Sequence, residues 1–296
     1  MKMKQLLVLV GIGMMSASLM ALPDSSGGGG TTTVKDSTII NTNQNVTNTA
    51  QDESKINSGI KARGSTIQNS TLMNDNKDVV NTAINRSKIN SGIEANDATI
   101  KDSTLINTNK NVNNTAVNES TINSGISANS ADIKNSTLIN DNTNVNNTAL
   151  EKSKINSGIS ADGSTIQDST ILNTNKDVNN MAVNGSTINS GVNADNATIK
   201  NSTLMNDNQN VNNTAINESK INSGINAEGA DVKDSTLINT NKDVNNMARD
   251  GSTINSGISV KGATVNNSTI MNDNKNVNNT ATNKSEINSG VDLGGN

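Results

Sequence analysis

The sequence repeats itself every 33 residues, and no copy gains or loses a residue. The string Ile-Asn-Ser-Gly, followed by Ile or Val, occurs eight times at this interval. Copies of the repeat begin at Ser37, Ser70, Ser103, Ser136, Ser169, Ser202, Ser235 and Ser268. A fixed period is typical of architectures in which each repeat packs on its neighbours. A shift by one residue would turn the apolar side chains of a strand to the solvent, so the lack of insertions indicates strict register.

Apolar residues are sparse within the repeat and mostly β-branched, and Asn, Ser, Thr and Gly separate them. These polar residues compete with helical hydrogen bonds, which argues against an ankyrin-type helical repeat of the same length. Alternation in segments such as Ser54-Lys55-Ile56-Asn57 predicts short half-buried strands. Asn-Ser-Gly and Asn-Thr-Asn are expected at the corners, because Gly and Asn tolerate positive φ. The sequence therefore predicts an all-β fold, a β-solenoid of eight 33-residue repeats.

The length of one turn, which we call a rung, has two interpretations. Each repeat contains two Ser-x-(Ile/Leu) segments, at Ser37 and Ser54, so it could form two rungs of about half the repeat length. That alignment would place Ile40 on Asn57, whereas a 33-residue rung places Asn on Asn, Gly on Gly and Ile on Ile. Stacked Asn side chains satisfy one another's amides along the stack, as in cross-β structures. The pattern favours one rung per repeat.

Stacking at this period predicts three structural columns as the candidate working residues, besides a further Asn column that starts at Asn41. The inward apolar column is Ile56, Ile89, Ile122, Ile155, Ile188, Ile221, Ile254 and Ile287. The hydrogen-bonding column is Asn57, Asn90, Asn123, Asn156, Asn189, Asn222, Asn255 and Asn288. The corner column is Gly59, Gly92, Gly125, Gly158, Gly191, Gly224, Gly257 and Gly290.

The N-terminus predicts export. Lys2 and Lys4 precede an apolar stretch that ends near Leu22, which is typical of a secretory signal peptide and a little short for a membrane anchor. We expect residues 1–21 to be the signal peptide, 22–36 a Gly/Ser-rich linker with a partial repeat, and 37–296 the solenoid. The chain has no Cys, which fits export without disulfide formation and excludes a lipoprotein anchor.

The composition excludes most chemistry. Without His or Cys there is no catalytic triad, Cys nucleophile, zinc site or haem site, and without aromatic residues there is no stacking platform for bases or sugars. The net charge is −4 with interspersed signs, so no basic nucleic-acid footprint exists. Thr42 and Asp75 begin a strict Thr/Asp alternation, which would place carboxylates two rungs apart, too far to share one calcium ion. We expect no enzyme activity, no cofactor, no metal and no small-molecule substrate.

The repeat array resembles the subunits of bacterial functional amyloids of the Fap and curli types. The shared features are a signal peptide, Asn/Gly/Ser/Ala-rich repeats almost free of aromatics and Cys, and a segment such as Ser190-Gly191-Val192-Asn193-Ala194. The resemblance implies a homopolymeric extracellular fibre of a Gram-negative bacterium, exported with an outer-membrane pore or nucleator, that serves biofilm matrix and adhesion.

The absence of an evident capping sequence at either end of the repeats agrees with end-to-end polymerisation. Two alternatives remain open. One is a monomeric ice- or surface-binding solenoid that uses the Thr column starting at Thr38. The other is the passive stalk of a surface adhesin.

Overall fold

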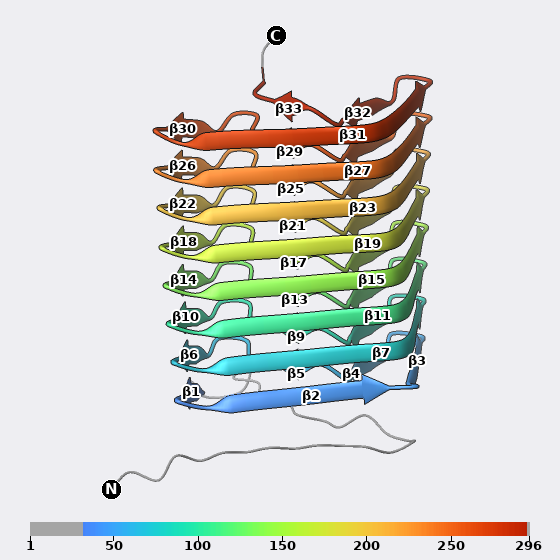
Figure 1. The fold of residues 1–296 in the computed structure, drawn as a ribbon. Helices are drawn as coiled ribbons and strands as arrows, with labels where there is room; N and C mark the ends of the chain where they lie inside the picture. Colours follow the sequence, from blue (N-terminus) through green and yellow to red (C-terminus); the bar gives the residue numbers. More distant parts are fainter. Residues whose placement is uncertain (1–31, 295–296) are drawn as a thin grey trace, which may run out of the picture.

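A computed structural model describes residues 32–294, and every regular element in this range is a β-strand. Eight tiers stack into a column with the N-terminal tier at one end and the C-terminal tier at the other (Figure 1). The prediction of an all-β solenoid is confirmed. The expected signal peptide, residues 1–21, lies outside the described residues. No helix in the described range could span a membrane.

Four parallel sheets run along the column, and each rung contributes a strand to each of them. Sheet 1 contains β1 (Thr33–Lys35), β6 (Thr66–Gln68), β10 (Thr99–Lys101), β14 (Asp132–Lys134), β18 (Thr165–Gln167), β22 (Thr198–Lys200), β26 (Asp231–Lys233) and β30 (Thr264–Asn266). Sheet 2 contains β2 (Thr38–Gln44), β3 (Thr47–Gln51), β7 (Thr71–Ile84), β11 (Thr104–Val117), β15 (Thr137–Leu150), β19 (Thr170–Val183), β23 (Thr203–Ile216), β27 (Thr236–Arg249) and β31 (Thr269–Thr282).

The two remaining sheets are built from strands of two or three residues. Sheet 3 contains β4 (Lys55–Asn57), β8 (Lys88–Asn90), β12 (Thr121–Asn123), β16 (Lys154–Asn156), β20 (Thr187–Asn189), β24 (Lys220–Asn222), β28 (Thr253–Asn255) and β32 (Glu286–Asn288). Sheet 4 contains β5 (Ile60–Lys61), β9 (Ile93–Glu94), β13 (Ile126–Ser127), β17 (Ile159–Ser160), β21 (Val192–Asn193), β25 (Ile225–Asn226), β29 (Ile258–Ser259) and β33 (Val291–Asp292).

The register between rungs is 33 residues in every sheet. Leu105 pairs with Leu138 in sheet 2, and Ile122 pairs with Ile155 in sheet 3. One repeat therefore forms one rung, and the alternative of two rungs per repeat is wrong. At about 4.8 Å per rung the eight rungs span roughly 38 Å.

Two expectations about local structure are wrong. The Asn-Thr-Asn segment is no corner, because Asn41 to Asn43 lie inside β2, and the equivalent strands of the later rungs reach 14 residues. The glycines of the Gly59 column also lack positive φ. Positive φ is found instead at other turns, mostly at Asn and Asp residues, for example 50° at Asp36 and 48° at Asn69, where the chain turns from sheet 1 into sheet 2.

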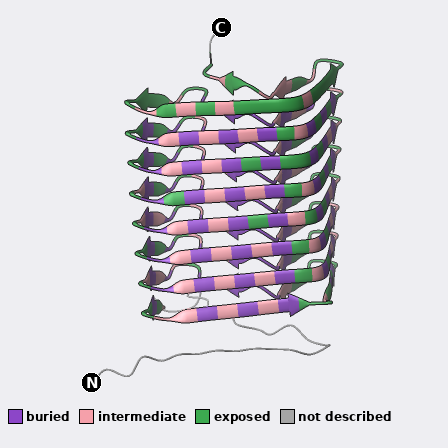
Figure 2. Cartoon of the chain, in the orientation of Figure 1, coloured by how far each residue is buried: buried purple, intermediate pink, exposed green. Residues whose placement is uncertain are grey.

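The core consists of stacked columns of small and medium apolar side chains. The largest cluster packs five columns between sheets 1, 2 and 4, and their first apolar members are Val34, Ile39, Ile60, Ala62 and Ala98. A second cluster packs the Ala50 column against the Ile56 column, and the Val79 column forms a third. Figure 2 shows the resulting alternation of buried residues with intermediate or exposed ones along the strands of sheet 2. Because identical side chains stack, the core closes without any aromatic residue.

Candidate functional site: the side-chain ladders and the C-terminal tip

The buried Asn column that starts at Asn41 is a continuous hydrogen-bonded ladder. In the fourth rung, Nδ2 of Asn140 donates to the carbonyl of Ser157 at 2.7 Å and to Oδ1 of Asn173 at 2.8 Å. Oδ1 of Asn140 accepts from Nδ2 of Asn107 at 2.8 Å. Both amide protons and the oxygen are therefore used. A fully satisfied polar network of this kind holds the register of a buried interface.

Two further buried ladders were not singled out from the sequence. Asn142 repeats the geometry of Asn140, with bonds of 2.9 Å to the Ser157 carbonyl and to Asn175. Asn147 donates to Asn180 at 2.9 Å. For Asn142 the spacing of two residues from Asn140 was the available signal, because residues two apart face the same side of a strand. Asn147 lies five residues beyond Asn142, and the positive φ of Asn144 between them shifts the alternation so that both are buried. In all three ladders the amide donates toward the C-terminal rung.

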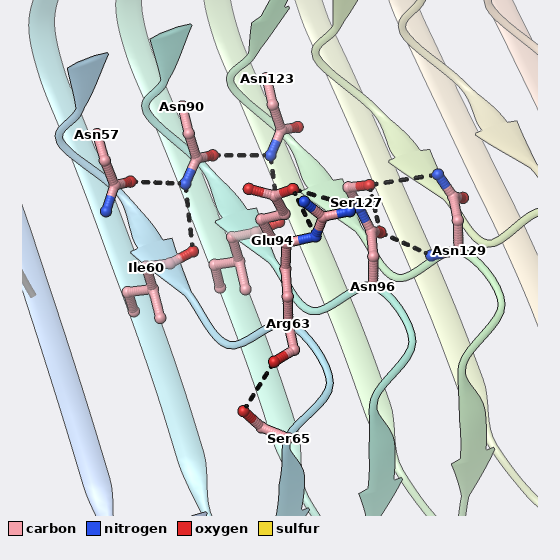
Figure 3. A network of polar contacts seen from close by, with 11 residues as sticks. Asn57, Ile60, Arg63, Ser65, Asn90, Glu94, Asn96, Asn123, Ser127 and Asn129 are labelled. Carbon is pink, nitrogen blue, oxygen red and sulfur yellow. Dashed lines mark hydrogen bonds and ion pairs between the residues drawn. The ribbon is translucent and has the colours of Figure 1, made fainter. Parts of the chain in front are cut away.

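The predicted column that starts at Asn57 forms a ladder of opposite direction on the outside of sheet 3. Nδ2 of Asn123 donates to Oδ1 of Asn90 at 2.9 Å and to the carbonyl of Ile93 at 3.3 Å. These side chains are half-buried, and Figure 3 shows Asn57, Asn90 and Asn123 in a row, joined by their hydrogen bonds. In the first rung, Nδ2 of Asn57 is buried and has no hydrogen-bond partner among residues 32–294. This orphan amide lacks the acceptors that the preceding rung supplies to every other member of the column.

The predicted Ile column lies inward, stacked in register along sheet 3. Ile89 to Ile254 are buried against the Ala50 column, while the two end members, Ile56 and Ile287, are partly buried. Each member pairs with its equivalent in the adjacent rung. The column thus contributes packing between sheets 2 and 3.

The predicted Gly column lies where sheet 3 turns into sheet 4. Glycine is required there because the backbones of successive rungs leave no room for a Cβ. A Cβ placed on Gly158 would lie 2.1 Å from the carbonyl oxygen of Gly191 and 2.7 Å from the backbone carbon of Ser190. Gly290, in the last rung, is the exception, because a Cβ there would meet nothing within 4 Å. The corner backbones of successive rungs are therefore in direct contact, which leaves no room for a side chain between them.

One outer column breaks the general separation of carboxylates. Thr108 pairs with Asp75 and with Asp141, so the Thr/Asp alternation keeps those carboxylates two rungs apart. In contrast, Asp162, Asp195 and Glu228 occupy the same column in three consecutive rungs. Burial, reinforced by the charges of Asp162 and Glu228, raises the pKa of Asp195 to about 6. No cluster of acidic residues in the described range is arranged to hold a metal ion.

These three carboxylates act as acceptors between rungs. The backbone N–H of Glu228 donates to Oδ1 of Asp195 at 3.0 Å, and Nδ2 of Asn226 donates to Oδ2 at 3.0 Å. In an earlier rung the amide of Asn129 serves the same purpose, accepting from the N–H of Asp162 at 3.0 Å and from Ser160 at 2.7 Å. The column requires an acceptor, and an amide supplies it as well as a carboxylate does.

A groove runs along the outside where sheets 3 and 4 meet. Its volume is about 770 Å³, and it is lined by the Asn57 ladder together with basic residues of the first rungs, Lys55, Lys88 and Arg63. Arg63 is paired with Glu94 at 3.4 Å (Figure 3). The described lining contains no aromatic residue, and its two carboxylates are those of Glu94 and Asp162.

The last described rung exposes strand edges and apolar side chains. Its strands β30, β31, β32 and β33 each lie at the edge of a sheet. Val265 is 40% exposed, Val291 43% and Leu293 64%, whereas their equivalents in the middle rungs are buried. Figure 2 shows this tier as largely exposed. Unpaired strand edges with exposed apolar columns are templates for the addition of another chain.

Comparisons with known proteins give no identity. No protein family and no curated protein matches the chain. Among solved structures, a plasmid-mediated fluoroquinolone resistance protein, QnrB1, is 12% identical with a TM-score of 0.17, covering 73% of this chain and 91% of its own. HetL, a pentapeptide repeat protein of heterocyst differentiation from the cyanobacterium Nostoc, is 10% identical with a TM-score of 0.13, covering 76% and 87%.

A third solved structure is the catalytic domain of a GH87 α-1,3-glucanase. It is 9% identical with a TM-score of 0.18, covering 86% of this chain and 64% of its own. At these values the similarities carry no inference about what this chain does.

Proposed function

We propose that this protein is an exported structural subunit that adds end to end into an extracellular, amyloid-like fibre. The observation that carries the proposal is the last described rung, where the side-chain amides of Asn272 and Asn274 lack the next-rung acceptors that the earlier members of their ladders have. No residue has a catalytic role in this proposal. The predicted signal peptide and the resemblance to functional amyloids support export and a role in biofilm matrix and adhesion.

A second copy seated on this rung repeats contacts already made between rungs. Nδ2 of Asn272 donates to the Ser289 carbonyl at 2.8 Å and lacks the second acceptor that each earlier member of its ladder has. Asn41 of an incoming copy supplies that acceptor, and Asn43 does the same for Asn274. The junction is then one more rung interface, in which backbone pairing and side-chain ladders continue as in cross-β structures.

The test uses the exceptional corner glycine. Ala at Gly290 has space in the single molecule, but in a fibre its Cβ would face Gly59 of the next copy. At Gly92 the same geometry brings a Cβ within 2.0 Å of the next glycine's carbonyl oxygen. We therefore expect Gly290→Ala to fold normally and to stop growth from its C-terminal tip.

Seeded growth, followed by light scattering and electron microscopy, measures the effect. Gly290→Ala added at a small fraction of the wild-type protein is expected to shorten the fibres, because it joins a growing end and then blocks it. Thr280→Ala is the matched control in the same rung, because Thr280 is exposed and Met occupies its position in two earlier rungs. Wild-type protein that stays dispersed beside its own fragments would refute the proposed function, and so would undiminished growth with Gly290→Ala.

A second candidate is favoured by the outer face of sheet 2. The Thr38 column stands in register there beside a column of half-exposed aliphatic residues that starts with Ile40 and Met73. Regular rows of hydroxyl and methyl groups on a flat strand face suit an ordered surface such as ice. Thermal hysteresis by the dispersed protein, lost when Thr104 and Thr137 are replaced by Lys, would support this alternative over the fibre.

A further inference from the structure

We propose that opposite charges on the two end rungs direct the joining of copies, so that the fibre grows head to tail with one register. This inference rests on the proposed end-to-end assembly and concerns the partner surface, which is a second copy of the chain. The evidence is that two outer columns, which start at Lys55 and at Glu53, carry opposite charges in their first and last described rungs.

The column on sheet 3 that starts at Lys55 is basic or neutral until its end. It contains Lys55, Lys88, Thr121, Lys154, Thr187, Lys220, Thr253 and Glu286. Glu286 is its single acidic residue, and in a head-to-tail junction Lys55 of the next copy follows it. Neither Glu286 nor Lys55 forms an ion pair among the described residues, and both side chains are exposed. Each is therefore available to a second copy.

A corner column that starts at Glu53 carries the reverse charges. It contains Glu53, Arg86, Glu119, Lys152, Gly185, Glu218, Gly251 and Lys284. Charged neighbours in this column always differ in sign, and Nη2 of Arg86 lies 2.8 Å from Oε1 of Glu53. Lys284 follows a glycine and has no ion pair within its own chain in the described range. Glu53 of the next copy would continue the alternation.

The unpaired amide of Asn57 favours the same head-to-tail orientation through an uncharged contact with the last rung of another copy. Its equivalent in the last rung, Asn288, donates to Oδ1 of Asn255 at 3.0 Å and to the carbonyl of Ile258 at 3.1 Å. In a head-to-tail junction, Asn57 would find the corresponding acceptors on Asn288 and Val291. A tail-to-tail contact would reverse the strands and bring the donating ends of the Asn272 and Asn274 ladders together. The ladders and the charges therefore select the same orientation.

These charge pairs act on association more than on final stability. Exposed ion pairs contribute little to affinity, but complementary charge raises the rate of productive encounter and disfavours wrong registers. The effect falls as salt rises, because the Debye length is about 10 Å at 0.1 M and about 3 Å at 1 M. Junction charges should therefore alter elongation in low salt and lose their influence in high salt.

A charge-exchange experiment tests the inference. Lys55→Glu and Glu286→Lys are made singly and together, and each purified protein grows on fragments of its own fibres at low salt. We expect each single variant to elongate about 10-fold more slowly than wild type, because it places like charges at the junction. The double variant restores opposite charges and should return to within about 2-fold of wild type. In 1 M NaCl the four proteins should converge.

Lys154→Glu is the control in the same column, because it reverses a charge in the middle of the stack and leaves the junction unchanged. Circular dichroism of the dispersed proteins establishes that all variants fold. Single variants that elongate at the wild-type rate, or a double variant as slow as the singles, would overturn the charge inference while fibres still form. Wild-type protein that forms no fibres would instead refute the proposed function, and the junction with it.

Discussion

The corner glycines allow one chemical change to be compared in two surroundings. Gly158→Ala places a methyl group 2.1 Å from the carbonyl oxygen of Gly191, whereas Gly290→Ala places it in open space. Neither glycine has positive φ, so backbone strain is the same in both. Any difference in stability between the two variants therefore reports the contact between rungs.

The loss in free energy of unfolding caused by Gly158→Ala can be estimated from the backbone hydrogen bonds at that corner. An ordinary contact needs about 3.4 Å, so the rungs must part locally by about 1 Å or more. Three hydrogen bonds between backbones are then stretched: Ser157 and Gly158 to the Asn189 carbonyl at 2.8 and 3.0 Å, and Ile159 to the Gly191 carbonyl at 2.9 Å. At about 1 kcal/mol for each lost bond, with unsatisfied buried groups in addition, we expect a loss of about 3–5 kcal/mol.

Gly290→Ala is expected to be neutral or slightly stabilising, by about 0.4–1 kcal/mol, because Ala restricts the unfolded chain. The assay is denaturant unfolding of the dispersed proteins, combined with hydrogen exchange at residues 157–159, because repeat arrays can unfold in parts. The reasoning fails if Gly158→Ala is as stable as Gly290→Ala, or if exchange at the corner does not accelerate. Either result would mean that the rungs tolerate a side chain between their backbones.

Two further perturbations address the polar groups. Asn140→Ala should lower the free energy of unfolding by about 3 kcal/mol, because it removes an acceptor of the Asn107 amide and leaves a cavity. Asn146→Ala, in an exposed ladder, should lower it by less than about 0.5 kcal/mol. Equal losses for the two variants would contradict the role of the buried ladder. Asp195 has its pKa raised from 3.8 to about 6, so the folded state holds its proton more tightly than the unfolded chain does, and the stabilisation from protonation is complete below about pH 4 and is lost as pH rises through 6. Asp195→Asn should therefore be more stable than wild type at pH 7.5 by about 1 kcal/mol after allowance for solvent screening, with the difference shrinking toward pH 4. The amide of Asn129 already fills this acceptor position in another rung, so the substitution keeps the hydrogen bonds. The free energy of unfolding of both proteins is measured in urea across this pH range. If it changes with pH in the same way for both, Asp195 is not the source of the pH dependence.

Repetition made the large-scale fold accessible from the sequence. Identical residues at intervals of 33 can stack without conflict only if each repeat is one turn, and the polar, β-branched composition leaves strands as the way to build that turn. The inward direction of the Ile56 column also followed from its alternation with polar neighbours. These conclusions needed only the period and the chemistry of single residues.

Local propensity led to wrong predictions for the Asn-Thr-Asn segment and for the role of the corner glycine. Asn-Thr-Asn was expected at a corner, but Asn41 and Asn43 face inward from a strand, because the carbonyl of Ser58 accepts from both amides. That carbonyl belongs to a different segment of the rung, so propensity alone did not indicate it. Gly59, the next residue, was expected to adopt positive φ. Its role is instead to let the backbones of successive rungs approach closely.

The period and the residue chemistry by themselves determined the architecture, because a strict repeat of β-forming residues stacks in register when each repeat forms one turn of a β-solenoid. Only the tertiary structure decided which polar residues are buried, which corners carry positive φ, and that the Asn ladders run in opposite directions. Those properties depend on groups that meet across a rung or between rungs, such as Asn140 with Ser157 and Gly158 with Gly191. Distances of that kind arise when four sheets close around a core, and no single segment of the chain contains them.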